Sequence, residues 1–106
     1  MTSTGGMNLI QRKVLDKFYA RAAGAPERLP WHRATPDQLL TQVVESGSRR
    51  GRALDVGCGS GVFSVYLAQQ GYEVTAIDMH PGAVAMARRA AEGLGGRMKV
   101  VQADVL

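Results

Sequence analysis

Three alternate glycines between a strand-like run and a helix-like run constrain this chain more than any other feature. Gly57, Gly59 and Gly61 follow the short apolar run Ala53–Val56, and a helix-like segment then extends to about Gln70. Glycine has no Cβ, so a turn built from it bends tightly and lets a ligand approach the backbone. The helix that follows offers unpaired amides at its N-terminus. We therefore favour a ligand-binding strand–turn–helix unit over an unliganded tight turn.

Three strand-like runs alternate with helix-like segments in residues 53–106. The strand-like runs are Ala53–Val56, Glu73–Ile77 and Met98–Gln102, and the second intervening helix is expected from Pro81 to about Glu92. Parallel neighbouring strands need a crossover helix, so the alternation predicts an α/β fold with parallel βαβ units. Right-handed crossovers without reversal place the strands side by side in the order three, two, one.

A helical segment is predicted in front of this α/β part. Apolar residues recur at every fourth position between residues 8 and 23, which indicates an amphipathic helix. A second helix is expected to start at a capping box, in which Thr35 is the cap, Pro36 the first helical residue and Gln38 the third, and to stop at Gly47. We divide the chain into a disordered tail (1–7), an N-terminal helical segment (8–52) and a partial α/β domain (53–106).

The charge balance argues against nucleic acid as a partner. The chain has 13 basic and 9 acidic residues, a net charge of +4 that is typical of some nucleic-acid and anion binders. The excess is confined to residues 1–52, where nine Lys or Arg face four Asp or Glu, while residues 53–106 hold four against five. No basic run exceeds two adjacent residues, so we do not expect nucleic acid binding.

The cysteine content and the apolar pattern indicate the compartment. A single cysteine cannot form an intramolecular disulfide, which favours a reducing environment. No signal-peptide pattern is present, and no stretch approaches the roughly 18 apolar residues of a membrane helix. We expect a soluble, cytoplasmic protein with no membrane partner.

Two acidic residues end the second and third strand-like runs. Asp78 lies 21 residues after Gly57, where a carboxylate can accept both hydroxyls of a ribose bound over the glycines. The alternative is a cap for the helix starting at Pro81. Asp104 is expected at the same edge of the sheet, beside the base of such a ligand, or else as a solvated loop acid. The dinucleotide fingerprint needs a glycine at position 62, where this chain has valine, so an NAD-binding role is weakened but stays open.

Together these residues resemble the class I S-adenosylmethionine-dependent methyltransferases. The run from Leu54 to Gly61 is similar to that family's first motif, Asp78 to its acidic residue after strand two, and Ala103–Val105 to its adenine-contacting segment. The resemblance implies S-adenosyl-L-methionine as cofactor. It also implies a Rossmann-like, doubly wound parallel sheet of seven strands, truncated here after strand three and preceded by two N-terminal helices.

The resemblance also implies roles for individual residues. Gly57 and Gly59 would pass close to the methionine portion, with Asp55 below them organising its amino group, and Asp78 would hold the ribose hydroxyls. Met79 would pack on the adenine. Trp31 is a candidate lid over the cofactor, although simple packing explains a lone tryptophan equally well. The full set of expected cofactor-binding residues is Asp55, Gly57, Cys58, Gly59, Gly61, Asp78, Met79, Asp104, Val105 and Trp31.

The segment Pro30–Pro36 resembles one that precedes the domain in small-molecule methyltransferases of the thiopurine and tellurite-resistance type. That segment commonly reads proline, tryptophan, aspartate, and here His32 stands in place of the acid. The resemblance implies a small-molecule methyl acceptor.

The remaining candidates each have a simpler structural explanation. Cys58 sits at a helix N-terminus, where a thiol can be activated, but a small apolar filler between glycines fits as well. His32 and His80 are possible bases, or ordinary surface and capping residues. The arginines of the linker Ser48–Arg52 suit an anionic substrate, or a solvated linker. No Gly-Lys-Ser/Thr sequence supports a phosphate loop, and no cluster of metal ligands is present. We assign no catalytic residue.

The family's sheet also has strands that this sequence does not supply. The ligand crevice of such folds lies between strands one and four, so strand one would be an open edge and the substrate side would be absent. We expect the cofactor-binding half of a small-molecule methyltransferase, one that on its own lacks the substrate site. The open edge is expected to take part in self-association or in pairing with a complementing C-terminal half. A non-catalytic remnant that binds a partner through this edge and an NAD-binding half are the alternatives.

Overall fold

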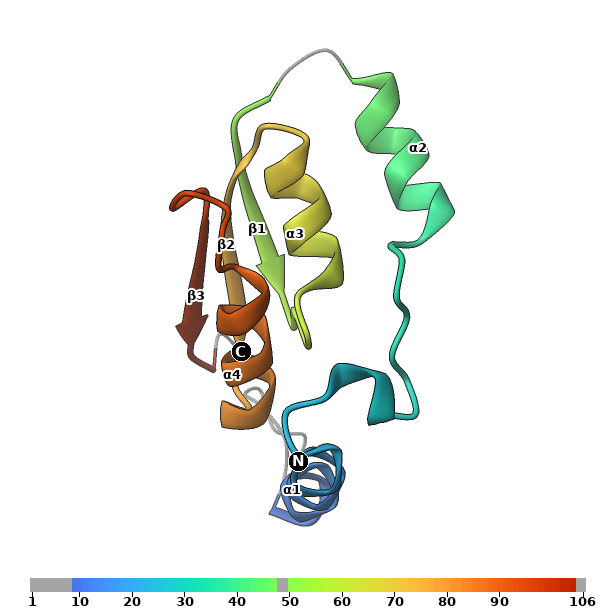
Figure 1. Cartoon of the computed structure of the whole chain (residues 1–106), viewed down its shortest axis with the longest axis vertical. Coiled ribbons are helices and arrows are strands. Elements are labelled where there is room, and N and C mark those ends of the chain that lie inside the picture. Colours follow the sequence, from blue (N-terminus) through green and yellow to red (C-terminus); the bar gives the residue numbers. More distant parts are fainter. Residues whose placement is uncertain (1–8, 48–49, 105–106) are drawn as a thin grey trace, which may run out of the picture.

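The computed structural model describes residues 9–47 and 50–104, which form a parallel sheet with helices on one face (Figure 1). The predicted disordered tail at residues 1–7 lies outside the described residues. No described helix has both the length and the apolar character needed to cross a membrane. The elements in chain order are α1 (Leu9–Ala22), the 3-10 helix η1 (Pro26–Arg28), α2 (Gln38–Ser46), β1 (Arg52–Val56), α3 (Val62–Gln69), β2 (Glu73–Asp78), α4 (Pro81–Ala90) and β3 (Met98–Gln102).

The sheet has the predicted strands and the predicted order. Strand β2 lies between β1 and β3, and both pairings are parallel, with Leu54 opposite Thr75 and Ala76 opposite Val100. The three arrows in Figure 1 therefore point the same way, and the carboxyl ends of the strands gather at the edge where α1 lies. Within the described ranges β1 pairs with β2 alone, so its other side is an open edge.

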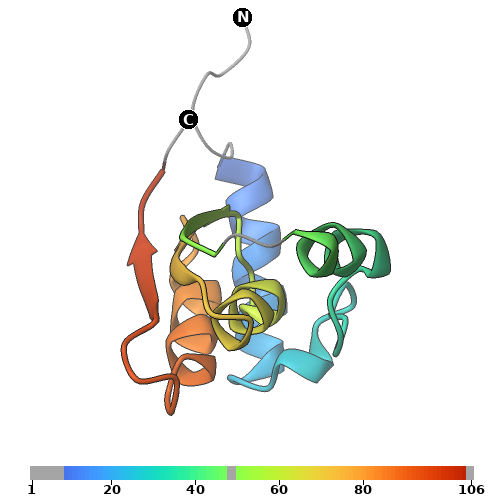
Figure 2. The same cartoon turned by 90° about the horizontal axis from the view of Figure 1, so that it is seen from above.

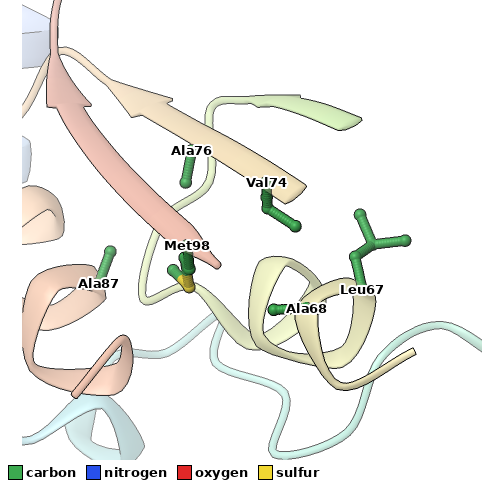
Figure 3. Packing of buried hydrophobic residues seen from close by; sticks show 6 residues of the cluster. All are labelled: Leu67, Ala68, Val74, Ala76, Ala87 and Met98. Atoms are coloured by element: carbon green, nitrogen blue, oxygen red, sulfur yellow. The ribbon is translucent and has the colours of Figure 1, made fainter. Parts of the chain in front are cut away.

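Helices α3 and α4 cover the same face of the sheet (Figure 2). Side chains alternate between the two faces along a strand, so Val74 and Ala76 of β2 point at the helices, while Met98 of β3 packs beside both (Figure 3). The buried cluster consists of Leu67, Ala68, Val74, Ala76, Ala87 and Met98. On the opposite face Leu54 and Val56 are exposed, and no described element covers them.

Helix α1 packs against α4 at the carboxyl edge of the sheet. Ala22, Leu29 and Met86 form a second buried cluster, against which Phe18 and Tyr19 pack. The approach is close because Gly82 has no side chain: a Cβ at this position would lie 2.6 Å from the Tyr19 ring. The fold therefore needs glycine at the point where α4 meets α1.

The predicted capping box of α2 is wrong. The N-cap is Asp37, whose Oδ1 accepts a hydrogen bond of 2.8 Å from the amide of Leu39, and Thr35 lies outside the helix. Asp37 keeps an extended ψ of 133°, so the helix starts only after it. A carboxylate at this position satisfies an amide that has no partner inside the helix. The helix ends before Gly47, as predicted.

The linker between α2 and β1 is tied to the end of α3. Arg50 donates from Nε to the carbonyl of Gln70 and from Nη1 to that of Gly47, each at 2.9 Å, and its guanidinium lies 5.3 Å from the centroid of the Tyr72 ring. Arg49 lies outside the described residues. These contacts give Arg50 a structural function in the linker.

Candidate functional site

The glycine turn, residues 57–61, is held against the end of β2. The amides of Gly57 and Cys58 both donate to the carbonyl of Ile77, at 2.7 and 3.0 Å. Gly57 has φ = +74° and Gly59 has φ = +55°, backbone conformations that other residues adopt only with strain. The glycines are therefore required by the path of the chain as well as by any ligand.

The three glycines differ in what surrounds them. A Cβ added to Gly57 or Gly59 would meet no heavy atom within 4 Å, whereas one on Gly61 would lie 3.1 Å from Cε of Met98 and 3.4 Å from Ala87. The first two glycines face open space at the carboxyl edge of the sheet. Gly61 instead allows the start of α3 to pack closely on α4 and β3.

Asp78 fixes the glycine turn from the end of β2. Its Oδ2 accepts from the amide of Gly59 at 3.0 Å, and its Oδ1 accepts from the amide of His80 at 2.9 Å. A carboxylate has about four acceptor positions, so capacity remains for a ligand's hydroxyl groups. The cap of α4 is His80, whose Nδ1 accepts from the amide of Gly82 at 2.9 Å. The alternative role considered for Asp78 therefore belongs to His80.

A cavity of about 390 Å³ opens over these residues, and we call it the glycine-turn pocket. It is lined by the glycine turn, the end of β2, the start of α3, helix α1 and the segment between η1 and α2. The lining residues are Leu15, Tyr19, Trp31, His32, Arg33, Thr35, Pro36, Asp37, Gly57, Cys58, Gly59, Ser60, Val62, Phe63, Asp78 and His80.

Half of the expected cofactor-binding residues line this pocket. They are Trp31, Gly57, Cys58, Gly59 and Asp78. Asp55 lies below the turn, where its Oδ2 accepts a 2.6 Å hydrogen bond from Oγ of Ser64 in α3. Gly61 is buried behind the turn, as described above.

Met79 and Asp104, which were expected at the adenine end, lie at the carboxyl ends of the strands but outside the pocket. Met79 follows β2 directly, and its carbonyl accepts from Nε2 of Gln102 at 3.5 Å. The amide of Ala103 donates to the carbonyl of Asp78 at 3.1 Å, which places the exposed Asp104 just beyond the end of β2. Val105 lies outside the described residues.

Trp31 packs on α1 and also lines the glycine-turn pocket. Its ring meets those of Phe18 and Tyr19 edge-on, with centroid distances of 5.4 and 5.8 Å, so it packs on α1. It is also 45% exposed and lines the pocket. Tyr19, which belongs to the helical segment predicted at residues 8–23, stacks on His80 at 4.3 Å and lines the same pocket. No local pattern signals this role, because it depends on a contact between distant segments.

The environment of Cys58 keeps its thiol protonated. Burial, followed by the negative charges of Asp78 and Asp55, raises the pKa of Cys58 from 9.0 to about 12. Because the thiolate is the reactive form, the structure supports the small apolar filler rather than an activated nucleophile. Burial and the charge of Asp78 likewise raise the pKa of Tyr19 to about 12.

The two histidines differ in how far their rings are engaged. His80 uses both ring nitrogens, Nδ1 towards Gly82 and Nε2 towards Asp16 at 2.6 Å, and is buried, so it is a structural residue rather than a base. His32 lines the pocket, and its Nδ1 lies 3.4 Å from Oγ of Ser60.

Comparison with known proteins identifies a family. The model of the methyltransferase domain matches residues 53–106. The 2-heptyl-1-hydroxyquinolin-4(1H)-one methyltransferase of Mycobacteroides abscessus is 33% identical over 78 residues, which are 69% of this chain and 34% of that protein. The ubiquinone biosynthesis O-methyltransferase of Xylella fastidiosa is 43% identical over 82 residues, covering 70% of this chain and 32% of that protein.

A solved structure agrees with these relatives. The protein studied for the conversion of a disulfide bond into a thioacetal group during echinomycin biosynthesis superposes with a TM-score of 0.74 and 32% identity, over 89% of this chain and 39% of that one. The chain spans about a third of the length of the curated relatives that it matches.

Proposed function

Because this chain belongs to the class I S-adenosylmethionine-dependent methyltransferases and corresponds to the N-terminal part of their domain, we propose that its glycine-turn pocket binds the cofactor and that the whole protein methylates a small molecule. The cofactor of the family is S-adenosylmethionine. The NAD-binding alternative loses its basis with this family assignment.

The residues of the pocket fit an adenosyl group with a charged amino-acid end. Pockets for ligands of this size are typically about 300 to 1,000 Å³, and the glycine-turn pocket has about 390 Å³. Gly57 and Gly59 leave open the space that a side chain would fill. The observation that carries the proposal is the carboxylate of Asp78, which two amides hold beside this space with acceptor capacity to spare.

We assign the residues in order along the edge of the sheet. Gly57, Cys58 and Gly59 would lie along the methionine portion, and Asp78 would accept the ribose hydroxyls. Asp55 would act indirectly, because its carboxylate binds Ser64 below the turn. The last group, Met79, Asp104 and Val105, would surround the adenine, and Trp31 would cover the pocket.

The chemistry that this chain itself contributes is binding and orientation. When bound, S-adenosylmethionine supplies a methyl group on a positively charged sulfur. Transfer requires alignment of the acceptor with the methyl and the sulfur, and a base where the acceptor must lose a proton. The protonated Cys58 and the fully bonded His80 do not suit the role of base.

The methyl acceptor and its binding side are part of the proposal. The two relatives are named for a hydroxyquinolone and for ubiquinone biosynthesis, and they support a small-molecule acceptor. This chain matches only about a third of their length, so we propose that a complementing C-terminal half pairs with the open edge of β1 and supplies the acceptor site. A single cysteine that is not engaged in a disulfide favours the cytoplasm.

Calorimetry with the chain tests cofactor binding. We expect S-adenosylmethionine and S-adenosylhomocysteine to bind and NAD not to bind. Replacing Asp78 by Ala removes charge-assisted hydrogen bonds worth about 1.5 to 3 kcal/mol, so the affinity should fall at least about tenfold. Glu92→Ala, which removes an exposed acid between α4 and β3, is the control and should leave the affinity for S-adenosylmethionine unchanged. Binding of NAD without S-adenosyl binding would overturn the proposal.

A further inference from the structure

His80 joins three segments that surround the glycine-turn pocket. Its amide donates to Oδ1 of Asp78, its Nδ1 accepts from the amide of Gly82, and its Nε2 lies 2.6 Å from Oδ1 of Asp16. Because Nδ1 accepts a hydrogen bond from an amide, the ring proton lies on Nε2, which donates a hydrogen bond to the Asp16 carboxylate. His80 is 4% exposed, so its ring is shielded from solvent.

The Asp16–His80 bond connects helix α1 to the loop after β2, 64 residues away in the chain. Tyr19 follows Asp16 by about one turn of α1, and its ring stacks on His80 with a centroid distance of 4.3 Å and an interplanar angle of 21°. The Trp31 ring then meets Tyr19 edge-on at 5.8 Å. Tyr19, Trp31 and His80 all line the pocket.

We propose that Asp16 is a positioning residue of this site. It holds α1 through His80, so that Tyr19 and Trp31 form the wall facing the glycine turn. The proposal rests on the function proposed above only in taking the pocket's ligand to be the cofactor. Asp16 itself does not line the pocket, and its side chain is 54% exposed. Its effect on the ligand is therefore expected to pass through His80.

The packing of α1 offers an independent way to move the same wall. A Cβ at Gly82 would lie 2.6 Å from the Tyr19 ring, much closer than real Cβ contacts. Gly82→Ala therefore displaces Tyr19 by steric contact, while both partners of the Asp16–His80 bond remain present. Two changes of different chemistry are expected to have the same consequence.

Trp31 makes the position of the wall measurable without any cofactor. It is the only tryptophan of the chain, and about half of it is exposed. In Asp16→Ala we expect its emission to shift to longer wavelength and its quenching by acrylamide to increase. We expect the dissociation constant for S-adenosylmethionine to rise about tenfold. Gly82→Ala should produce the same two changes.

The conservative variant separates positioning from general stability. Asp16→Asn keeps an oxygen that can accept a hydrogen bond from Nε2 of His80. Its Trp31 emission should therefore match that of the parent, and its dissociation constant for S-adenosylmethionine should lie within about threefold of the parent value. Lys13→Ala, one turn earlier on the exposed part of α1, is the matched control and should change neither. The proposal fails if Asp16→Ala leaves Trp31 emission unchanged, or if Asp16→Asn is as damaging as Asp16→Ala.

The outcome is distinguishable from failure of the proposed function. If the parent chain binds no S-adenosylmethionine, the proposed cofactor role falls, whereas Trp31 emission and quenching still decide whether Asp16 holds the wall. If Asp16→Ala loses cooperative unfolding, the comparison of Asp16→Asn and Gly82→Ala with the parent decides it. Parent-like emission in Gly82→Ala would then overturn the proposal.

Discussion

Single residues with the same backbone conformation have different tasks in this chain. Gly57 and Gly93 have φ values of +74° and +84°, and a Cβ at either position would meet nothing within 4 Å. Gly57 lines the glycine-turn pocket, whereas Gly93 lies in the turn after α4, at the other edge of the sheet. The pair therefore separates the cost of backbone strain from the loss of ligand space.

We predict that Gly57→Ala and Gly93→Ala each lower the free energy of unfolding by about 1 to 2 kcal/mol, the cost of a left-handed conformation for a residue with a Cβ. Only Gly57→Ala should weaken S-adenosylmethionine binding, by about tenfold or more. Urea unfolding and calorimetry measure the two effects. Equal affinity in the two variants would contradict a ligand over Gly57.

Cys58 gives a prediction on pH. Its pKa in the folded chain is about 12 against an ordinary 9.0, so above pH 9 the unfolded chain loses a proton that the folded chain keeps. Stability should therefore fall as the pH rises from 9 towards 12. The pKa of Tyr19, which is raised from 10.0 to about 12, adds to the loss of stability above pH 10.

Urea unfolding at pH 8 and pH 10 checks this expectation. The loss between the two should be smaller in Cys58→Ala than in the parent. In the folded parent at pH 8 the thiol should also react more slowly with a disulfide reagent than in urea, because burial and its raised pKa lower the fraction present as the reactive thiolate. Comparable rates would contradict a protonated, shielded thiol.

Among the elements, α2 has the weakest attachment to the rest of the molecule. Its residues Leu39, Leu40 and Val43 are exposed, while Val44 packs against the main core and Glu45 accepts a 3.2 Å hydrogen bond from the Tyr66 hydroxyl. With little apolar burial, the helix depends strongly on its own ends. The cap at Asp37 therefore matters more here than in a well-packed helix.

We predict that Asp37→Ala destabilises α2 by about 1 kcal/mol, the usual cost of losing an N-cap. Because the helix can open locally, hydrogen exchange at the amides of Thr41 to Val44 is the measurement to use. Thr35→Ala is the control and should leave exchange unchanged. Equal acceleration in both variants would restore the capping box that the sequence suggested.

At the scale of the whole molecule, one face of the sheet and the outer sides of β1 and β3 have no partner among the described elements. Ala53 and Asp55 point towards α3, so the alternating side chains of β1 point away from it. Leu54 is 63% exposed there, beside the open edge of β1. Exposed strand edges with apolar neighbours promote association. This surface is therefore suited to the complementing C-terminal half proposed above.

We predict that the chain associates at high concentration and that Leu54→Lys reduces this association. Leu39→Lys is the matched control, since Leu39 is 72% exposed but lies on α2. Light scattering over a concentration series measures the effect. If the two variants act equally, general surface hydrophobicity rather than the β1 region is responsible.

Most of the fold could be predicted from short sequence patterns. The strands, their order and the helices between them follow from alternating apolar runs and from glycines at the turns, and they deviate by only a few residues at the ends. The predicted start of α2 was wrong because Thr35 and Asp37 are both good N-cap residues. Which of the two caps the helix depends on where the chain leaves the preceding loop. Asp37 also lies 3.3 Å from Arg33, a contact that the capping pattern does not include.

The site could be predicted only for residues that belong to one strand–turn–helix unit or to the end of a neighbouring strand. Gly57, Gly59 and Asp78 are of this kind, since parallel strands bring their carboxyl ends together wherever they form. Of the wall of the pocket, only Trp31 was expected, as a candidate lid. Tyr19 was not expected there, because it reaches the pocket through the docking of α1.

The sequence by itself determined the strand–turn–helix unit, the parallel order and the family, because each depends on local backbone preferences and on a fixed spacing of residues. Only the tertiary structure decided that Asp16 meets His80, that Gly82 admits the Tyr19 ring and that Cys58 stays protonated. These features depend on burial and on contacts between segments up to 64 residues apart, and no local pattern encodes a distance of that kind.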